Sequence, residues 1–156
     1  MLRKIRVLVV DDSAFMRKAV TEILESNPGI QVAGTAKNGL EGMNMVKSLK
    51  PDVIILDIDM PVMDGLTSMR HMMIESPAPI VVLSSLFADG AITFEALRLG
   101  VVDFVPKPSG AISDNIDRAK QNLIARVKLA NTVNMDNIRR VRLDKAEKKE
   151  QLVDLY

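Results

Sequence analysis

Short apolar runs alternate with longer amphipathic segments over the first 130 residues of the chain. The runs are rich in Val, Ile and Leu and are bounded by turn-forming residues, which is the pattern of buried β-strands. They cover residues 5–10, 30–36, 53–57, 80–83 and 103–105. The pattern therefore predicts five short strands.

The segments between and after these runs carry apolar residues at intervals of three or four, as one face of a helix does. They predict helices over about residues 14–26, 40–49, 66–74, 92–99 and 113–130. Ser13 is a candidate N-cap, and Gly100 is a candidate C-cap residue. The apolar face of the second helix is predicted from four residues: Leu40, Met43, Val46 and Leu49.

Alternating strands and helices are typical of an α/β fold, here a doubly wound, mostly parallel sheet with helices on both faces. We assign residues 1–130 to this single domain. Residues 131–156 are mostly polar and charged, and they show no apolar core of their own. We expect this last segment to be a helical or polar linker.

Composition excludes several classes of function. The chain has 156 residues, and its 21 basic and 20 acidic residues give a net charge of +1, which argues against a nucleic-acid partner. It has no Cys, so disulfides, thiol catalysis and cysteine-ligated zinc are excluded. No apolar stretch approaches the ~20 residues that span a bilayer, so we expect a cytoplasmic protein without membrane insertion.

Acidic side chains follow the first and third predicted strands. Asp11 and Asp12 come directly after residues 5–10, and Asp57 ends the run 53–57. The carboxyl ends of parallel strands share one edge of a sheet, so the three carboxylates should meet there and repel one another. Oxygen ligands favour Mg²⁺, or another divalent metal, and the backbone carbonyl of Asp59 is placed to add a ligand.

The same edge offers groups suited to phosphoryl transfer. An ionised carboxylate such as Asp57 can attack phosphorus directly and form an aspartyl phosphate. Because this chemistry needs mainly positioning and neutralisation of phosphoryl oxygens, Lys107 and the hydroxyl of Ser84 are candidate partners for those oxygens. Both follow predicted strands, as the carboxylates do.

Other interpretations remain open at this point. Asp57 alone could be a metal ligand or an ordinary acid at a strand end, and Asp11-Asp12 alone could be an acid pair favoured by a helix dipole. The sequence Asp57-Ile-Asp also suits an aspartate-nucleophile phosphatase of the haloacid dehalogenase type, although Pro61 stands where that motif has Thr or Val. In such a phosphatase Asp59 would be the acid/base.

Together these residues resemble the receiver domains of two-component response regulators, and Asp57-Ile-Asp-Met-Pro-Val-Met-Asp64-Gly65 resembles their phosphoacceptor loop. The resemblance implies a flavodoxin-like sheet in the order 2-1-3-4-5 and phosphorylation of Asp57 by a histidine kinase. It further implies a ligand set and a switch pair. Asp12, Asp57 and the Asp59 carbonyl would bind Mg²⁺, Asp11 would assist through water, and the switch pair would be Ser84 and Phe104.

A narrower resemblance concerns the receivers of chemotaxis protein-glutamate methylesterases. It rests on three segments, residues 11–17, 79–86 and 95–108. In that family the unphosphorylated receiver covers the esterase site, and phosphorylation relieves the block. The implied partners are a chemotaxis histidine kinase, a methylesterase output domain of the same parent protein, and chemoreceptor complexes.

The hydrolase itself is not expected within this chain. The sequence contains no Gly-x-Ser-x-Gly elbow, and its one histidine is His71, in a predicted helix. We therefore interpret the chain as the regulatory part of such an enzyme, mediating only its own phosphorylation and dephosphorylation. The alternative is a freestanding receiver that acts by phosphorylation-dependent binding of a partner.

Overall fold

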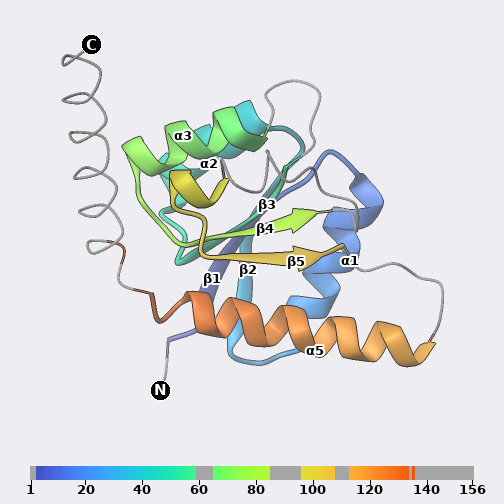
Figure 1. The fold of residues 1–156 in the computed structure, drawn as a ribbon. Coiled ribbons are helices and arrows are strands. Elements are labelled where there is room, and N and C mark those ends of the chain that lie inside the picture. Colours follow the sequence, from blue (N-terminus) through green and yellow to red (C-terminus); the bar gives the residue numbers. More distant parts are fainter. Residues whose placement is uncertain (1–2, 59–64, 85–95, 108–112, 134, 136–156) are drawn as a thin grey trace, which may run out of the picture.

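The computed structural model describes residues 3–58, 65–84, 96–107, 113–133 and 135. Its centre is a parallel sheet of five strands in the order β2-β1-β3-β4-β5, which confirms the predicted α/β class and strand order (Figure 1). The elements are β1 (Ile5–Val10), α1 (Ala14–Glu25), β2 (Ile30–Ala36), α2 (Gly39–Leu49), β3 (Val53–Asp57), α3 (Gly65–Glu75), β4 (Ile80–Ser84), β5 (Asp103–Pro106) and α5 (Ser113–Ala130).

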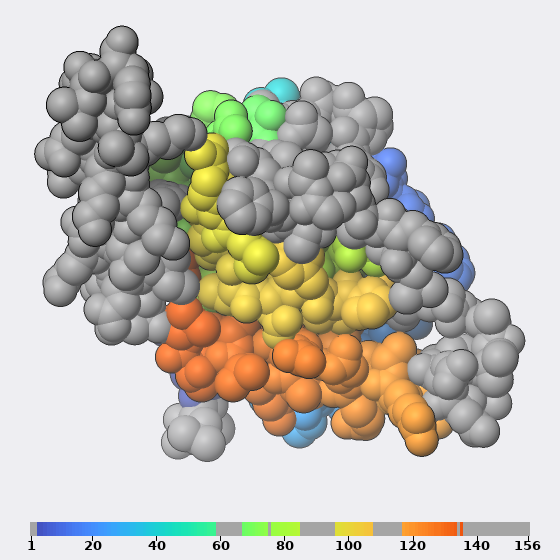
Figure 2. Space-filling model, in the orientation of Figure 1, coloured from blue at the N-terminus to red at the C-terminus, as the bar shows by residue number. Residues whose placement is uncertain are grey.

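Helices cover both faces of the sheet and create two separate cores. The first core lies between the sheet and α2 and α3, and Val46, Met69 and Met72 are among its buried members. The second lies between the sheet and α1 and α5, with Leu24 and Leu123 buried. Figure 2 shows α5, in orange, running alongside the yellow segment that contains β5. The carboxyl edge of the sheet, which carries the candidate residues, is therefore held in place by helices packed on both faces.

β3 is the middle strand, and all five of its residues are buried. It pairs in parallel with β1 and with β4, and Asp57 lies opposite Leu83. A strand that is covered on both faces has to be continuously apolar, which explains the run Val53–Leu56. Asp57, the last residue of β3, is the one charged residue of the strand and is buried at its carboxyl end.

Two predicted caps are present. The hydroxyl of Ser13 accepts a hydrogen bond from the Met16 amide at 3.2 Å, as an N-cap does. Gly100 has φ 101° and ends the helical turn 96–99, and the amide of Val101 donates to the Ala96 carbonyl at 3.1 Å. Residues 92–95 of that predicted helix lie outside the described residues.

The predicted apolar face of α2 is wrong at one position. Leu40 is 45% exposed, whereas Gly39, Gly42 and Val46 are buried. A Cβ on Gly42 would lie 3.0 Å from both methyl groups of Val10, so glycine lets this helix approach β1 closely. That close approach turns the buried face toward the glycines and leaves Leu40 on the outside.

The segment after α5 begins with a contact to the domain. Met135 is partly buried and packs against the first core, the cluster that also borders Phe104. The rest of the predicted linker, residues 136–156, lies outside the described residues. Within the described ranges no helix has both the length and the hydropathy of a membrane span.

Candidate functional site

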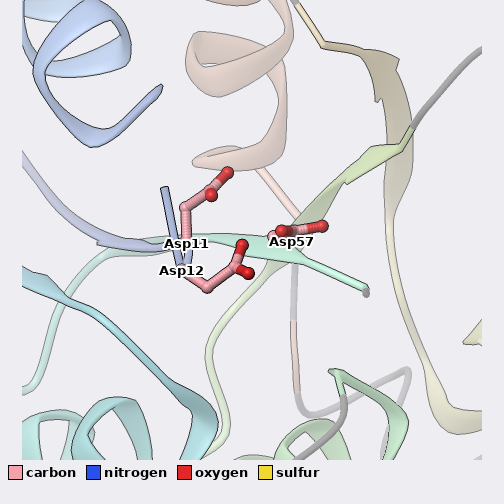
Figure 3. A group of neighbouring side chains, drawn as sticks. All are labelled: Asp11, Asp12 and Asp57. Atoms are coloured by element: carbon pink, nitrogen blue, oxygen red, sulfur yellow. The ribbon is translucent and has the colours of Figure 1, made fainter. Parts of the chain in front are cut away.

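Three carboxylates meet at the carboxyl edge of β1 and β3. Asp11 and Asp12 follow β1, Asp57 ends β3, and one carboxylate oxygen from each lies within 4.8 Å of the others (Figure 3). Asp11 and Asp57 are fully buried, whereas Asp12 is exposed. The structure therefore brings together the three side chains that sequence reasoning placed at this edge, with Asp12 on the solvent side.

Asp11 is held by several hydrogen bonds. Its amide donates to the Ala36 carbonyl at 3.0 Å, which extends the pairing of β1 with β2. Its Oδ1 accepts from the Ser13 amide at 2.9 Å, and its carbonyl accepts from Arg17 Nη1 at 2.7 Å. Asp11 Oδ2 is buried and has no hydrogen-bond partner among the described residues. Burial raises the pKa of Asp11, opposed by the Ser13 amide and Lys107, while the charge of Asp12 adds to the rise.

Lys107 brings a positive charge to the cluster from beyond β5. Its Nζ lies 3.1 Å from Asp57 Oδ2, and its amide donates to the Ser84 carbonyl at 2.9 Å. Burial alone would lower the pKa of Lys107, but its hydrogen bond to Asp57 and the charges of Asp57, Asp11 and Asp12 outweigh burial, so the pKa is raised. The ammonium group is therefore held in its charged form beside Asp57.

The other predicted residues lie on neighbouring strands. Ser84 ends β4, is half-buried and pairs with Pro106. Phe104 lies on β5 opposite Val82 and packs, partly buried, against the first core. Asp59 is outside the described residues, so the position of its carbonyl is not part of this geometry.

The charge balance of the cluster fits a divalent cation. Three carboxylates lie close together around two buried aspartates, and the ammonium group of Lys107, which pairs with Asp57, is the one cationic group in an ion pair with them among the described residues. The buried Oδ2 of Asp11, which no donor satisfies among the described residues, is an oxygen suited to a cation. Hard oxygen ligands with one ligand open to solvent suit Mg²⁺, which keeps several waters when bound.

Replacing Lys107 with Met should destabilise the metal-free protein by about 1–3 kcal/mol, because it removes the positive charge beside the buried Asp57 carboxylate. Urea unfolding in a chelating buffer measures this loss. Millimolar Mg²⁺ should restore more stability to the variant than it adds to the wild type. The matched control is Arg126→Met, which removes an exposed pair with Asp103 and should cost about 1 kcal/mol or less. Equal losses in the two variants would contradict the prediction.

Arg17 is a site residue that the sequence analysis missed. Its contact with the Asp11 carbonyl reaches back over the turn that joins β1 to α1. A basic residue six positions after a strand-end acid is a weak signal, because the same residue suits a solvated helix face. Only the side-chain direction in the folded chain distinguishes the two roles.

A sheet in the order β2-β1-β3-β4-β5, with three carboxylates and a lysine at its carboxyl edge, defines the class of response regulator receivers. The profile of the response regulator receiver domain matches residues 7–117. The chain belongs to this family. Membership confirms the resemblance seen in the sequence and decides against a phosphatase of the haloacid dehalogenase type.

Individual relatives show which kind of receiver-containing protein the chain resembles. The chain is 55% identical over 129 residues to a protein-glutamate methylesterase/protein-glutamine glutaminase of Symbiobacterium thermophilum, a match that covers 82% of this chain and 36% of the relative. A Pyrococcus abyssi protein of the same name is 45% identical over 152 residues, covering 94% of this chain and 41% of the relative. The chain thus spans well under half the length of these curated relatives.

A solved structure agrees with these matches. The response regulator domain of Thermotoga maritima CheB superposes with a TM-score of 0.76 at 45% identity, covering 85% of this chain and 99% of that one. The receiver domain of a putative response regulator NarL from Mycobacterium tuberculosis gives 0.73 at 27% identity, over 85% and 100% of the two chains. The similarity to the CheB receiver therefore covers a whole domain.

Proposed function

We propose that this chain is the regulatory receiver of a protein-glutamate methylesterase, and that it works by accepting a phosphoryl group on Asp57. The observation that carries the proposal is the position of Asp57. It is buried at the end of the central strand, grouped with Asp11 and Asp12 and 3.1 Å from Lys107 Nζ. Charged groups that are already held in place, two of them on fully buried aspartates, act strongly on a transferring phosphoryl group.

The proposed reaction needs no general base. An ionised oxygen of Asp57 attacks phosphorus of a phosphohistidine on the kinase, the new P–O bond forms, and the P–N bond breaks with its electron pair left on the imidazole nitrogen. Lys107 Nζ neutralises one phosphoryl oxygen, and the Ser84 hydroxyl donates to another. Hydrolysis of the resulting acyl phosphate would return Asp57 to its ionised form.

The metal part of the proposal rests on the same cluster. Asp11, Asp12 and Asp57, together with the carbonyl of Asp59, would hold Mg²⁺, with Asp11 acting through water. Bound there, Mg²⁺ supplies two positive charges that offset the carboxylates and the phosphoryl oxygens. The acidic side chains of this chain supply the ligands and their orientation.

Phosphorylation would be relayed through Ser84 and Phe104. We propose that the Ser84 hydroxyl moves toward the phosphoryl group and that the Phe104 ring turns inward. Phe104 and Met135 pack against the same core. A rotation of the Phe104 ring would therefore alter the packing around Met135, near the start of the segment after α5. Residues 131–156 would then link the receiver to the output domain, and the kinase and that domain are the proposed partners. A freestanding receiver gains no support, because the matched relatives are named as methylesterases.

Exchange of receivers tests the proposed output. Residues 1–130 would replace the matching receiver of the Symbiobacterium thermophilum relative, and hydrolysis of protein glutamate methyl esters would be followed with and without Mg²⁺ and acetyl phosphate. We expect the phosphodonor to raise hydrolysis several-fold, to have no effect with Asp57→Asn, and to act normally with the control Asp52→Asn, whose aspartate pairs with Arg3 at the opposite end of β3. A chimera that is phosphorylated but whose hydrolysis does not change would refute the methylesterase assignment and leave the receiver chemistry standing.

A further inference from the structure

Arg17 contacts both ends of the turn that carries the acidic pair. It lies in the first turns of α1 with a half-buried side chain, and its Nη1 donates to the Asp11 carbonyl at 2.7 Å. Its amide donates to the Ser13 carbonyl at 2.9 Å, the first hydrogen bond of the helix. One residue therefore fixes the backbone on either side of Asp12.

The placement of Arg17 is unfavourable for the helix alone. A cation near the N-terminus of a helix opposes the helix dipole, and the first turn of α1 contains no acidic residue to offset it. The bond to Asp11 supplies a compensating interaction. Asp11 is buried, a buried carbonyl requires a donor, and a charged donor makes the stronger hydrogen bond.

We propose that Arg17 is a positioning residue for the metal site, which holds the turn 11–13 so that the carboxylates of Asp11 and Asp12 stay directed at the cation. This inference rests on the proposed function, because it assumes that the cluster binds Mg²⁺. Partners that orient metal ligands without touching the metal commonly alter metal affinity by about 10- to 100-fold when removed.

Arg17 acts through the backbone of Asp11. Its hydrogen bond is to the carbonyl and not to the carboxylate. Removing Arg17 should therefore disturb the direction of the ligands more than the local charge.

The experiment measures Mg²⁺ affinity by isothermal titration calorimetry on the full chain. Arg17→Met should raise the Kd for Mg²⁺ about tenfold. Arg17→Lys should raise it by about threefold, because a single ammonium replaces the planar guanidinium only in part. Lys18→Met removes an exposed neighbouring cation and should leave the Kd within about twofold, as expected for a surface charge.

A second measurement separates positioning from stability. Thr21 Oγ donates to the Arg17 carbonyl at 2.7 Å, so Thr21→Val perturbs α1 without altering the turn. If Arg17 only stabilised the fold, Arg17→Met and Thr21→Val would shift the Kd alike for equal losses of stability. We expect only Arg17→Met to raise the Mg²⁺ concentration for half-maximal phosphorylation by acetyl phosphate, with the rate at saturating Mg²⁺ unchanged.

An unchanged Kd in Arg17→Met overturns the inference. If that variant does not fold, Arg17→Lys decides alone: a Kd raised about threefold supports positioning, and a wild-type Kd refutes it. A wild-type chain that binds no Mg²⁺ would instead contradict the proposed function, so the two failures are distinguishable.

Discussion

Replacing Asp57 with Asn should reduce phosphorylation by acetyl phosphate to the detection limit. An amide oxygen is neutral and is a poor nucleophile compared with an ionised carboxylate, so no acyl phosphate can form at position 57. The substitution keeps the size of the side chain, and the strand around it is fully buried and apolar, so the fold should persist. Intact mass after incubation with Mg²⁺ shows the presence or absence of one added phosphoryl group.

Asp103→Asn is the matched control. Asp103 is the first residue of β5 and pairs with Arg126 at 3.2 Å, so it is an aspartate of the same sheet that lies outside the cluster. This variant should be phosphorylated like the wild type, and omission of Mg²⁺ should prevent the gain in both. A phosphoryl group that still appears in folded Asp57→Asn would mean that another side chain is the acceptor.

Asp11→Asn should have opposite effects on metal binding and on stability. Loss of one charged group from the cluster should weaken Mg²⁺ binding by on the order of 10- to 100-fold, since ligand charge is a main determinant of affinity in such sites. In chelating buffer the free energy of unfolding should rise by about 1–3 kcal/mol, because a buried oxygen with no donor among the described residues is replaced by an amide able to donate to a neighbouring carboxylate.

Urea unfolding in chelator and in Mg²⁺ measures both effects. The wild type should gain stability with Mg²⁺ according to its affinity, and Asp11→Asn should gain little. Asp52→Asn removes an aspartate that pairs with Arg3 at 2.7 Å, outside the cluster, and should leave the response to Mg²⁺ unchanged. If Asp11→Asn were less stable than the wild type in chelator, the cost assigned to the buried Asp11 Oδ2 would be wrong.

Much of this architecture could be predicted because the decisive signals are local. β3 is predicted and observed over the same residues, since a strand covered on both faces has to be continuously apolar. The caps at Ser13 and Gly100 follow from side-chain chemistry and from positive φ, which are properties of single residues. The meeting of Asp11 and Asp57 follows from the parallel order of their strands, which places their ends at one edge.

The features that escaped prediction depend on contacts between distant segments. Leu40 is exposed because Gly42 lets α2 approach β1, and the approach distance is invisible in the periodicity of α2. Lys50 ends the same helix with φ 47°, where glycine is the expected residue. Met135 packs on the core although its neighbours in sequence are polar. The exposure of Leu40 and the packing of Met135 therefore depend on contacts across elements, which a local sequence pattern does not show.

The most direct test of the central claim is to locate the phosphoryl group. The chain would be phosphorylated with acetyl phosphate and Mg²⁺ and reduced with borohydride, which converts an aspartyl phosphate to homoserine. Peptide fragmentation would then separate position 57 from the aspartates at positions 59 and 64. We predict homoserine at position 57 alone. Homoserine at another position, or none in a chain that has gained phosphoryl mass, would contradict the assignment of Asp57 as the acceptor.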